Sequence, residues 1–181
     1  MERHKIDLRD IKLAGRVLDI GGGGEGVISR YAGDSTIAID IRKGELEESP
    51  EVGIKIVMDA RDMQFLDNTF DNATCFFSLM FMSDETMEKV LREAFRVLKA
   101  GACLWIWDAI LPPADGEGSF VVQLAVQLDH EEITTGYGIG WKGAYKGCGL
   151  HDILELCKKV GFGTVESHEN EQTYFIKAVK A

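Results

Sequence analysis

Residues able to do chemistry gather around one run of glycines near the start of the chain. Residues 21–24 are four consecutive glycines, and Asp19 precedes them by two positions. Consecutive glycines let a backbone adopt positive φ angles or lie directly against another molecule. The apolar run 17–20 leads into them and a helical pattern follows, so the loop precedes a helix N-terminus, where free backbone N–H groups and a partial positive charge face a ligand. We therefore expect a ligand-binding loop.

Two classes of ligand use such a loop. Gly21, Gly23 and Gly26 fit the dinucleotide fingerprint, with Asp40 about where a ribose-binding acid falls. A run of glycines satisfies many spacings, however, so that match is weak. The carboxylate of Asp19 would repel a pyrophosphate but attract a ligand with a cationic amino group. It therefore favours the cationic ligand, while the glycine spacing alone leaves both classes open.

Alternating strand and helix patterns surround this loop. They predict an α/β fold with a parallel sheet covered on both faces. Amphipathic helices are expected at residues 84–99 and 151–160, each closely followed by a glycine. A closing antiparallel hairpin is expected over residues 163–179. The parallel strands are expected at residues 16–20, 36–40, 54–59, 72–77 and 102–107.

Aspartates follow three of these expected strands. Asp40 ends the second strand, Asp59 ends the third, and Asp108 directly follows the fifth. In open α/β sheets, ligands bind at the carboxyl edge of the strands. We therefore expect these carboxylates to lie near the glycine loop.

The segment V-L-D-I-G-G-G at residues 17–23 resembles the first motif of the class I methyltransferases that use S-adenosylmethionine (SAM). Three later segments resemble further motifs of this family in the same order. Residues 65–71 resemble its "L-P-F-x-x-x-x-F-D", and residues 96–101 resemble its "R-V-L-K-P-G", with Ala100 in place of the proline. Residues 160–162 match its "A-G-F".

The resemblance implies a Rossmann-like, doubly wound sheet of seven strands in the order 3-2-1-4-5-7-6, with strand 7 antiparallel. It implies SAM as cofactor and S-adenosylhomocysteine (SAH) as product, with the glycine loop at the methionine end of SAM. Asp40 would hold both ribose hydroxyls, because a carboxylate accepts two hydrogen bonds at once. The expected cofactor-binding residues are Asp19, Gly21, Gly22, Gly23, Asp40, Ile41, Asp59, Ala60 and Ser78.

The reaction so implied is methyl transfer to an acceptor, which we expect to be a small molecule. Asp108 is our first candidate for a general base, followed by Tyr137, Tyr145 and His151. The apolar stretch at residues 78–82 suits a poorly solvated sulfonium. The identity of the acceptor does not follow from the sequence.

Two other functions stay open at this point. An NAD(P)-dependent oxidoreductase would use the same glycine spacing, although Asp19 and the closing hairpin count against it. A SAM-binding non-catalytic or partner-dependent subunit is the second alternative, because the apolar exit of the fourth strand offers no polar catalytic group.

Residues 111–149 lie outside the resemblance and carry a second pattern. Apolar residues alternate over 120–128 and again over 133–141, which predicts an antiparallel hairpin with one apolar face. With a four-residue turn between the strands, the expected cross-strand pairs are Leu128 with Ile133, Leu124 with Tyr137 and Phe120 with Trp141.

An apolar face of this size must be covered. Only about sixteen residues precede the first predicted strand, so the N-terminal helices that often roof the pocket in this family are expected to be missing or reduced. We expect the hairpin at 119–141 either to roof the acceptor site in their place or to form a homodimer contact.

Composition limits the remaining options. At 181 residues, the chain is expected to form one domain over 1–181, with an insertion at 111–149. A net charge of −10 argues against a nucleic-acid partner. The chain shows neither an 18-residue apolar span nor a signal peptide, so we expect a cytoplasmic protein without a membrane segment. The four cysteines lack C-x-x-C spacing and D-H-E-E at 129–132 fits a polar turn, so no metal is expected.

Overall fold

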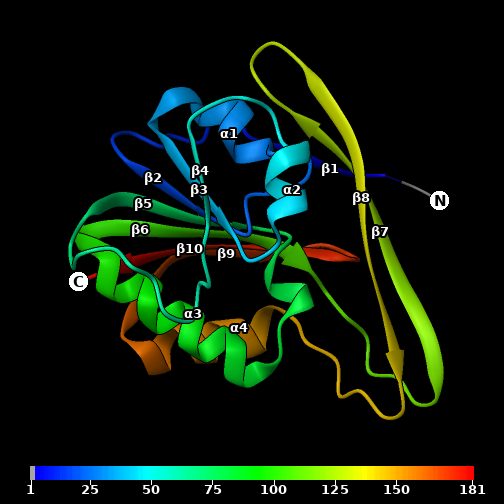
Figure 1. The fold of residues 1–181 in the computed structure, drawn as a ribbon. Coiled ribbons are helices and arrows are strands. Elements are labelled where there is room, and N and C mark those ends of the chain that lie inside the picture. The colour runs from blue at the N-terminus through cyan, green and yellow to red at the C-terminus, as the bar shows by residue number, and fades with distance from the viewer. Residues whose placement is uncertain (1–2) are drawn as a thin grey trace.

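The computed structural model describes residues 3–181, and seven of the strands in it form a main sheet (Figure 1). These strands are β2 (Val17–Ile20), β3 (Thr36–Asp40), β4 (Ile54–Val57), β5 (Phe70–Phe76), β6 (Leu98–Ala109), β9 (Phe162–Glu169) and β10 (Thr173–Lys180). Their spatial order is β4-β3-β2-β5-β6-β10-β9, which reads 3-2-1-4-5-7-6 when these seven strands are numbered along the chain. β10 is antiparallel to both of its neighbours, and the other pairs are parallel. The fold class is the expected α/β Rossmann-like one.

A smaller sheet of three strands stands beside the main one. Its order is β1 (His4–Asp7), β7 (Glu117–Gln127) and β8 (Glu132–Lys142). β7 and β8 form the expected hairpin, which runs as a long ribbon along one flank of the molecule (Figure 1). β1 was not expected from the sequence. It pairs in parallel with β7 and so ties the start of the described chain to the hairpin.

Both faces of the main sheet are covered, one by α3 (Asp84–Val97) and α4 (Leu150–Val160) and the other by α1 (Val27–Ala32) and the small sheet. A further helix is α2 (Lys43–Glu48), and there are 3-10 turns η1 (Gly33–Ser35) and η2 (Leu79–Phe81). α3 begins at Ser83, whose hydroxyl accepts a hydrogen bond from the Thr86 N–H. Apolar residues of α3 and α4 pack on one face of the sheet, and those of α1 and the hairpin pack on the other. α2 was not expected from the sequence.

Strand β6 shows how one strand serves both cores. Leu104 and Ile106 point toward α3 and α4, whereas Trp105 and Trp107 point toward the hairpin. Successive side chains of a strand alternate between its faces, so a fully apolar strand is needed where both faces are covered. The Trp105 and Trp107 rings stack 6.3 Å apart and give the hairpin a flat aromatic surface.

The hairpin has the expected faces but a different register. Its turn is tighter than expected, because the Leu128 N–H donates to the Glu131 carbonyl and only two residues remain between them. The expected pairs were therefore wrong by two positions. A shift of two keeps every side chain on its face. The pairs observed include Val126 with Ile133, Val122 with Tyr137, and Gly118 with Trp141.

The apolar face of the hairpin is covered within the chain itself. Val122, Leu124 and Val126 are fully buried, and they belong to the same cluster as Trp105 and Trp107. The hairpin thus packs on the main sheet, and its expected role as a roof over the acceptor site stays a prediction. Its apolar face is not available to a second copy, so a homodimer through 119–141 would need a different surface of the hairpin.

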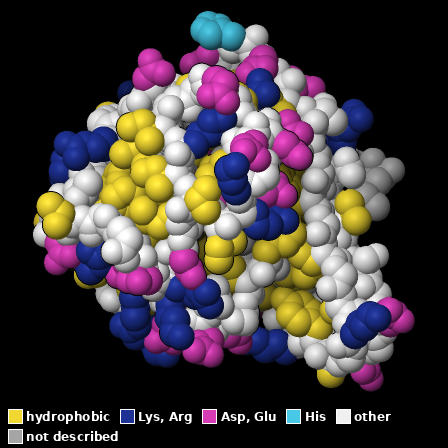
Figure 2. All heavy atoms as spheres, in the orientation of Figure 1, with side chains coloured by type: hydrophobic (Ala, Val, Ile, Leu, Met, Phe, Trp, Pro, Cys, Tyr) yellow, Lys and Arg dark blue, Asp and Glu magenta, His cyan; other side chains and the backbone are white. Residues whose placement is uncertain are grey.

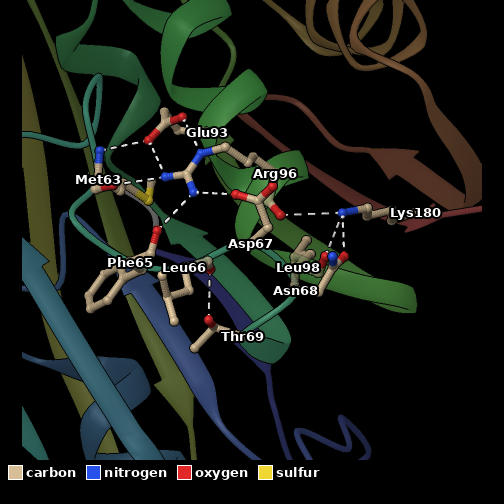
Figure 3. A network of polar contacts seen from close by, with 10 residues as sticks. All are labelled: Met63, Phe65, Leu66, Asp67, Asn68, Thr69, Glu93, Arg96, Leu98 and Lys180. Atoms are coloured by element: carbon tan, nitrogen blue, oxygen red, sulfur yellow. Dashed lines mark hydrogen bonds and ion pairs between the residues drawn. The ribbon is translucent and has the colours of Figure 1, made fainter.

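A network centred on Arg96 holds the segment that leads into β5 (Figure 3). The Arg96 guanidinium donates to the carbonyls of Met63 and Phe65, and it pairs with the carboxylates of Asp67 and Glu93. One side chain at the end of α3 therefore fixes the course of residues 63–67. Arg96, the first residue of the segment 96–101 that resembles the family motif, thus has a structural role.

Candidate functional site

A cleft of about 830 Å³ opens at the carboxyl edge of β2, β3, β4 and β5. Its volume falls within the usual range for small-molecule sites. Figure 2 shows hydrophobic side chains gathered in the hollow between the body of the molecule and the hairpin, with acidic and basic side chains above them. The cleft is lined by residues 19–28, 39–42, 58–61, 76–78, 81–83 and 135–138, together with Glu45, Glu48, Thr86 and Val90.

The glycine loop forms one wall of the cleft, and its bare backbone is packed tightly. A Cβ on Gly22 would lie 2.5 Å from Oδ2 of Asp19, and a Cβ on Gly23 would lie 2.4 Å from Cβ of Glu45. Any side chain at these positions would push neighbouring groups away. The loop is therefore glycine-rich because other parts of the protein lie directly against it.

The loop offers fewer free N–H groups than we expected. The N–H groups of Gly21 and Gly22 donate to the Ile39 carbonyl, and that of Gly24 donates to the Glu45 carbonyl. The N–H groups of these three glycines are therefore already paired, and the expectation of free N–H groups at the start of the following helix stays a prediction. These bonds tie the loop to β3 and α2, which makes the wall rigid before any ligand binds.

Asp19 lies beneath the loop and lines the cleft. Its side chain is buried, and its Oδ1 accepts a hydrogen bond of 2.7 Å from the Thr74 hydroxyl on the neighbouring β5. Burial raises the pKa of Asp19 to about 7, and the negative charge of Asp40 adds to the rise. A cationic group bound in the cleft would oppose this shift and stabilise the ionised carboxylate.

The acids at the ends of the next two strands also reach the cleft. Asp40 uses Oδ1 to accept the Arg42 N–H at 2.9 Å, and its Oδ2 faces Gly23. Asp59 forms hydrogen bonds to the Arg61 guanidinium through both carboxylate oxygens, which lowers its pKa. The remaining neighbours from the expected set, Ile41 and Ala60, line the cleft beside these acids, and Ile41 is 61% exposed.

The exit of β5 closes the cleft on its apolar side. Phe77 adopts a φ of 49°, which is rare for a large side chain. The next residue, Ser78, is buried and lines the cleft, and its hydroxyl has no hydrogen-bond partner among the described residues. Farther along, Phe81 is half exposed and forms the apolar wall expected from the sequence together with Met82.

The hairpin supplies the opposite wall. The ring of Tyr137 on β8 stacks on the ring of Phe77, with centroids 5.1 Å apart and planes 8° from parallel. Burial raises the pKa of Tyr137, and the carboxylates of Asp19 and Glu25 add to the rise. The hydroxyl of Tyr137 is therefore protonated at neutral pH.

Asp108, the first candidate for a general base, does not line the cleft. It is fully buried, and its Oδ2 accepts hydrogen bonds from the N–H groups of Leu79 and Met80. Burial raises the pKa of Asp108 to about 7. The interpretation of Asp108 as a base that meets the acceptor does not fit this geometry. Its carboxylate instead holds the turn η2 at the edge of the cleft.

The other two candidates for a base lie elsewhere. Tyr145 stacks on Trp141, 6.3 Å away, near the far end of the hairpin. His151 is exposed near the start of α4. Neither lines the cleft.

The lining of the cleft carries an excess of negative charge. It contains six carboxylates and two guanidinium groups, and each guanidinium is paired with one of the carboxylates. Such a lining attracts a cation and opposes a pyrophosphate. The groups are Asp19, Glu25, Asp40, Glu45, Glu48 and Asp59 against Arg42 and Arg61.

Several lining residues were not expected from the sequence. Glu45 and Glu48 come from α2, which carries too few apolar residues to show a helical period. Thr135 to Gly138 reach the cleft only because the hairpin folds back over the sheet. The alternating pattern predicted the hairpin but could not predict which of its residues meet the glycine loop.

The described residues contain neither a metal-binding cluster nor a helix able to span a membrane. Within residues 3–181, no group of three or more His, Cys, Asp or Glu side chains is arranged to hold a metal ion. None of the helices in the same range has the length and apolarity needed to cross a bilayer.

Comparison with known proteins agrees with this geometry. A family model described as a methyltransferase domain matches residues 18–106. The chain is 33% identical over 125 residues to a ubiquinone/menaquinone biosynthesis C-methyltransferase of Cronobacter sakazakii, covering 61% of this chain and 49% of the relative. It is 26% identical over 171 residues to a sterol 24-C-methyltransferase of Schizosaccharomyces pombe, covering 88% of this chain and 42% of that protein.

A solved structure supports the fold. The crystal structure of a SAM-dependent methyltransferase from Methanosarcina mazei superimposes with a TM-score of 0.65 at 20% identity, covering 94% of each chain. Residues 18–106 thus match the methyltransferase-domain family, and together with the fold they support a class I SAM-dependent methyltransferase with SAM as cofactor and SAH as product. The chain spans about half the length of the two curated relatives named above.

Proposed function

We propose that the protein transfers the methyl group of SAM to a small, largely apolar acceptor that binds between the exit of β5 and strand β8. The observation that carries this proposal is the composition of the cleft. Its polar end has acids at the ends of successive strands, and its other end is formed by Phe76, Phe77, Phe81, Met82 and Tyr137. A cationic, partly polar donor and an apolar acceptor would lie end to end there.

Each polar residue has a task in holding the donor. The free oxygen of Asp40 accepts hydrogen bonds from the ribose hydroxyls, and Ile41 packs against the adenine. Asp59 and the Ala60 backbone take the polar edge of the adenine. The glycine loop and the hydroxyl of Ser78 take the methionine end.

The carboxylate of Asp19 completes the donor site by its charge. It faces the ammonium group of the methionine moiety, which compensates for its burial. Because it already accepts the Thr74 hydroxyl, its orientation is fixed before the ligand enters. The site is in this sense organised in advance.

Bound SAM supplies an electrophilic methyl group on a sulfonium. The new bond forms between the methyl carbon and a lone or ionised electron pair of the acceptor, while the carbon–sulfur bond breaks and its electrons stay on sulfur. The chain's residues contribute alignment and the exclusion of water. The apolar wall around Phe77 removes water from the methyl group, and Phe81 and Met82 confine the acceptor. Since Asp108 is held inside the protein, we assign no general base.

We infer the chemical class of the acceptor from the apolar wall of the cleft and from the names of the two curated relatives. The two relatives named above are, by name, C-methyltransferases of quinone biosynthesis and of a sterol. An acceptor of similarly apolar character would suit the aromatic wall. One domain over 1–181, with its insertion at 111–149, and action in the cytoplasm without a nucleic-acid partner stay predictions.

Two measurements test this function. Calorimetry should show that SAM and SAH bind with dissociation constants of about 1 μM or tighter, which corresponds to roughly 8 kcal/mol. Incubation with methyl-labelled SAM and a panel of quinols, phenols and sterols should form SAH and a labelled product. Tighter binding of NADH than of SAH would refute the donor assignment. Binding without transfer to any panel member or cell extract would favour a SAM-binding subunit without catalytic activity.

A further inference from the structure

The inserted hairpin lines the cleft with residues that include Tyr137, whose ring stacks on a residue with a strained backbone. Phe77 has a φ of 49°, in the left-handed region that large side chains avoid. Such a conformation persists only when its surroundings hold it in place. The groups that hold Phe77 in this conformation therefore also determine the position of the next residue, Ser78.

Phe77 is buried, and three of its contacts come from neighbouring strands and aromatic rings. Its N–H donates to the Trp107 carbonyl at 2.8 Å, which continues the β5–β6 ladder by one residue. Its ring meets the ring of Phe76 edge-on, with centroids 5.1 Å apart. Its flat face stacks on Tyr137, which comes from the hairpin and not from the sheet. The first two contacts come from the main sheet, whereas the third comes from the hairpin on the other side of the cleft.

Tyr137 is itself held firmly by the hairpin. Val122, directly opposite it on β7, is fully buried. The neighbours of Tyr137 along β8 are Gly136 and Gly138, so the adjacent positions add no side chains to the opposite face of the strand. The ring position is thus set by the packing of β7 and β8 on the main sheet.

The residue after Phe77 is Ser78, whose side chain is polar and requires a hydrogen-bond partner. Ser78 is 7% exposed, lines the cleft, and has a hydroxyl without a hydrogen-bond partner among the described residues. A buried hydroxyl left unpaired costs free energy, so this one fits a ligand group. Its Cβ lies 2.6 Å from the point where a Cβ on Gly21 would stand. The hydroxyl is therefore next to the glycine loop.

We propose that Tyr137 is a positioning residue: by stacking on Phe77, it holds the left-handed conformation that presents the Ser78 hydroxyl to the methionine end of SAM. This inference rests on the proposed function. It assigns the hairpin a task in cofactor binding, in addition to covering the sheet. The family model that matches residues 18–106 does not include the hairpin.

The test compares SAH binding by calorimetry in four proteins. Tyr137→Ala removes the stacked ring and should weaken binding by roughly three- to tenfold, the loss of about one hydrogen bond. Tyr137→Phe keeps the ring and should bind within about twofold of the unaltered protein. Ile139→Ala, a truncation on the same face of β8 outside the cleft lining, should also leave binding unchanged.

A double-mutant cycle decides whether Tyr137 acts through Ser78. If it does, Tyr137→Ala should weaken binding little further when Ser78→Ala is already present. Additive losses would overturn the proposal, as would unchanged binding by Tyr137→Ala or an equal loss in Tyr137→Phe. Thermal melting checks that each variant folds, and Tyr137→Leu replaces Tyr137→Ala if the alanine variant does not. Failure of the unaltered protein to bind SAH would refute the proposed function itself, which separates the two outcomes.

Discussion

Replacing Asp40 with alanine tests the proposed ribose site. One oxygen of Asp40 accepts the Arg42 N–H, and the other lies toward Gly23 in the cleft. The substitution would remove the acceptor for the ribose hydroxyls. It would also free one N–H in an exposed part of the chain, where water can replace the lost partner.

The expected loss follows from the chemistry of these bonds. Hydrogen bonds to an ionised acceptor contribute about 1.5–3 kcal/mol, so SAH should bind about 10- to 150-fold more weakly. The Asp40→Asn variant retains one oxygen acceptor and should show a smaller loss. The melting temperature of the free protein should change little in both variants.

Calorimetric titration with SAH, alongside thermal melting, measures both quantities. Asp34→Ala is the matched control, because Asp34 is an exposed acid in η1 outside the cleft lining. Its affinity should equal that of the unaltered protein. Unchanged affinity in Asp40→Ala would refute the ribose assignment, and an equal loss in Asp34→Ala would attribute the effect to net charge alone.

Three further predictions concern stability and are checked by urea unfolding. Gly44→Ala in α2 should stabilise the protein by about 0.4–1 kcal/mol, since the added Cβ meets no atom within 4 Å; a destabilised variant would contradict this. Burial raises the pKa values of Asp19 and Asp108 from 3.8 to about 7, so the folded state keeps protons that the unfolded state releases, and the free energy of unfolding should fall between about pH 4 and pH 7. Asp108→Asn should reduce the slope of the free energy of unfolding against pH in this range. An unchanged slope would contradict the prediction. Leu124→Ala should lower the free energy of unfolding by about 2–5 kcal/mol because its side chain is fully buried between the hairpin and the main sheet, whereas Val121→Ala on the exposed face should lower it far less.

Periodicity predicted most of the main sheet, because most of its strands are apolar and buried. The second strand was placed at residues 36–40, where β3 lies. β1 was missed because its four residues, H-K-I-D, include only one buried side chain. Its pairing with β7 joins segments more than a hundred residues apart, and no local pattern reports such a contact.

The sequence predicted the site residues whose positions depend on strand topology. It missed those whose positions depend on tertiary packing. Asp40 and Asp59 lie at the cleft because the carboxyl ends of parallel strands meet at one edge. Asp108 also follows from that rule, but the alternation along β6 places it on the side of Leu104 and Ile106, away from the cleft. Tyr137 reached the cleft through the fold of the hairpin, which depends on tertiary packing alone.

The position of β10 determines when the main sheet can be completed during folding. It follows every other described strand along the chain, yet it lies between β6 and β9 in the sheet. Phe175 on β10 packs on Trp107, so the aromatic floor beneath the hairpin is incomplete until β10 has paired. During synthesis, the ribosome must release nearly the whole described chain before this floor can close. Such non-local pairing slows folding. We therefore expect chaperones to bind this aromatic surface while it is still exposed.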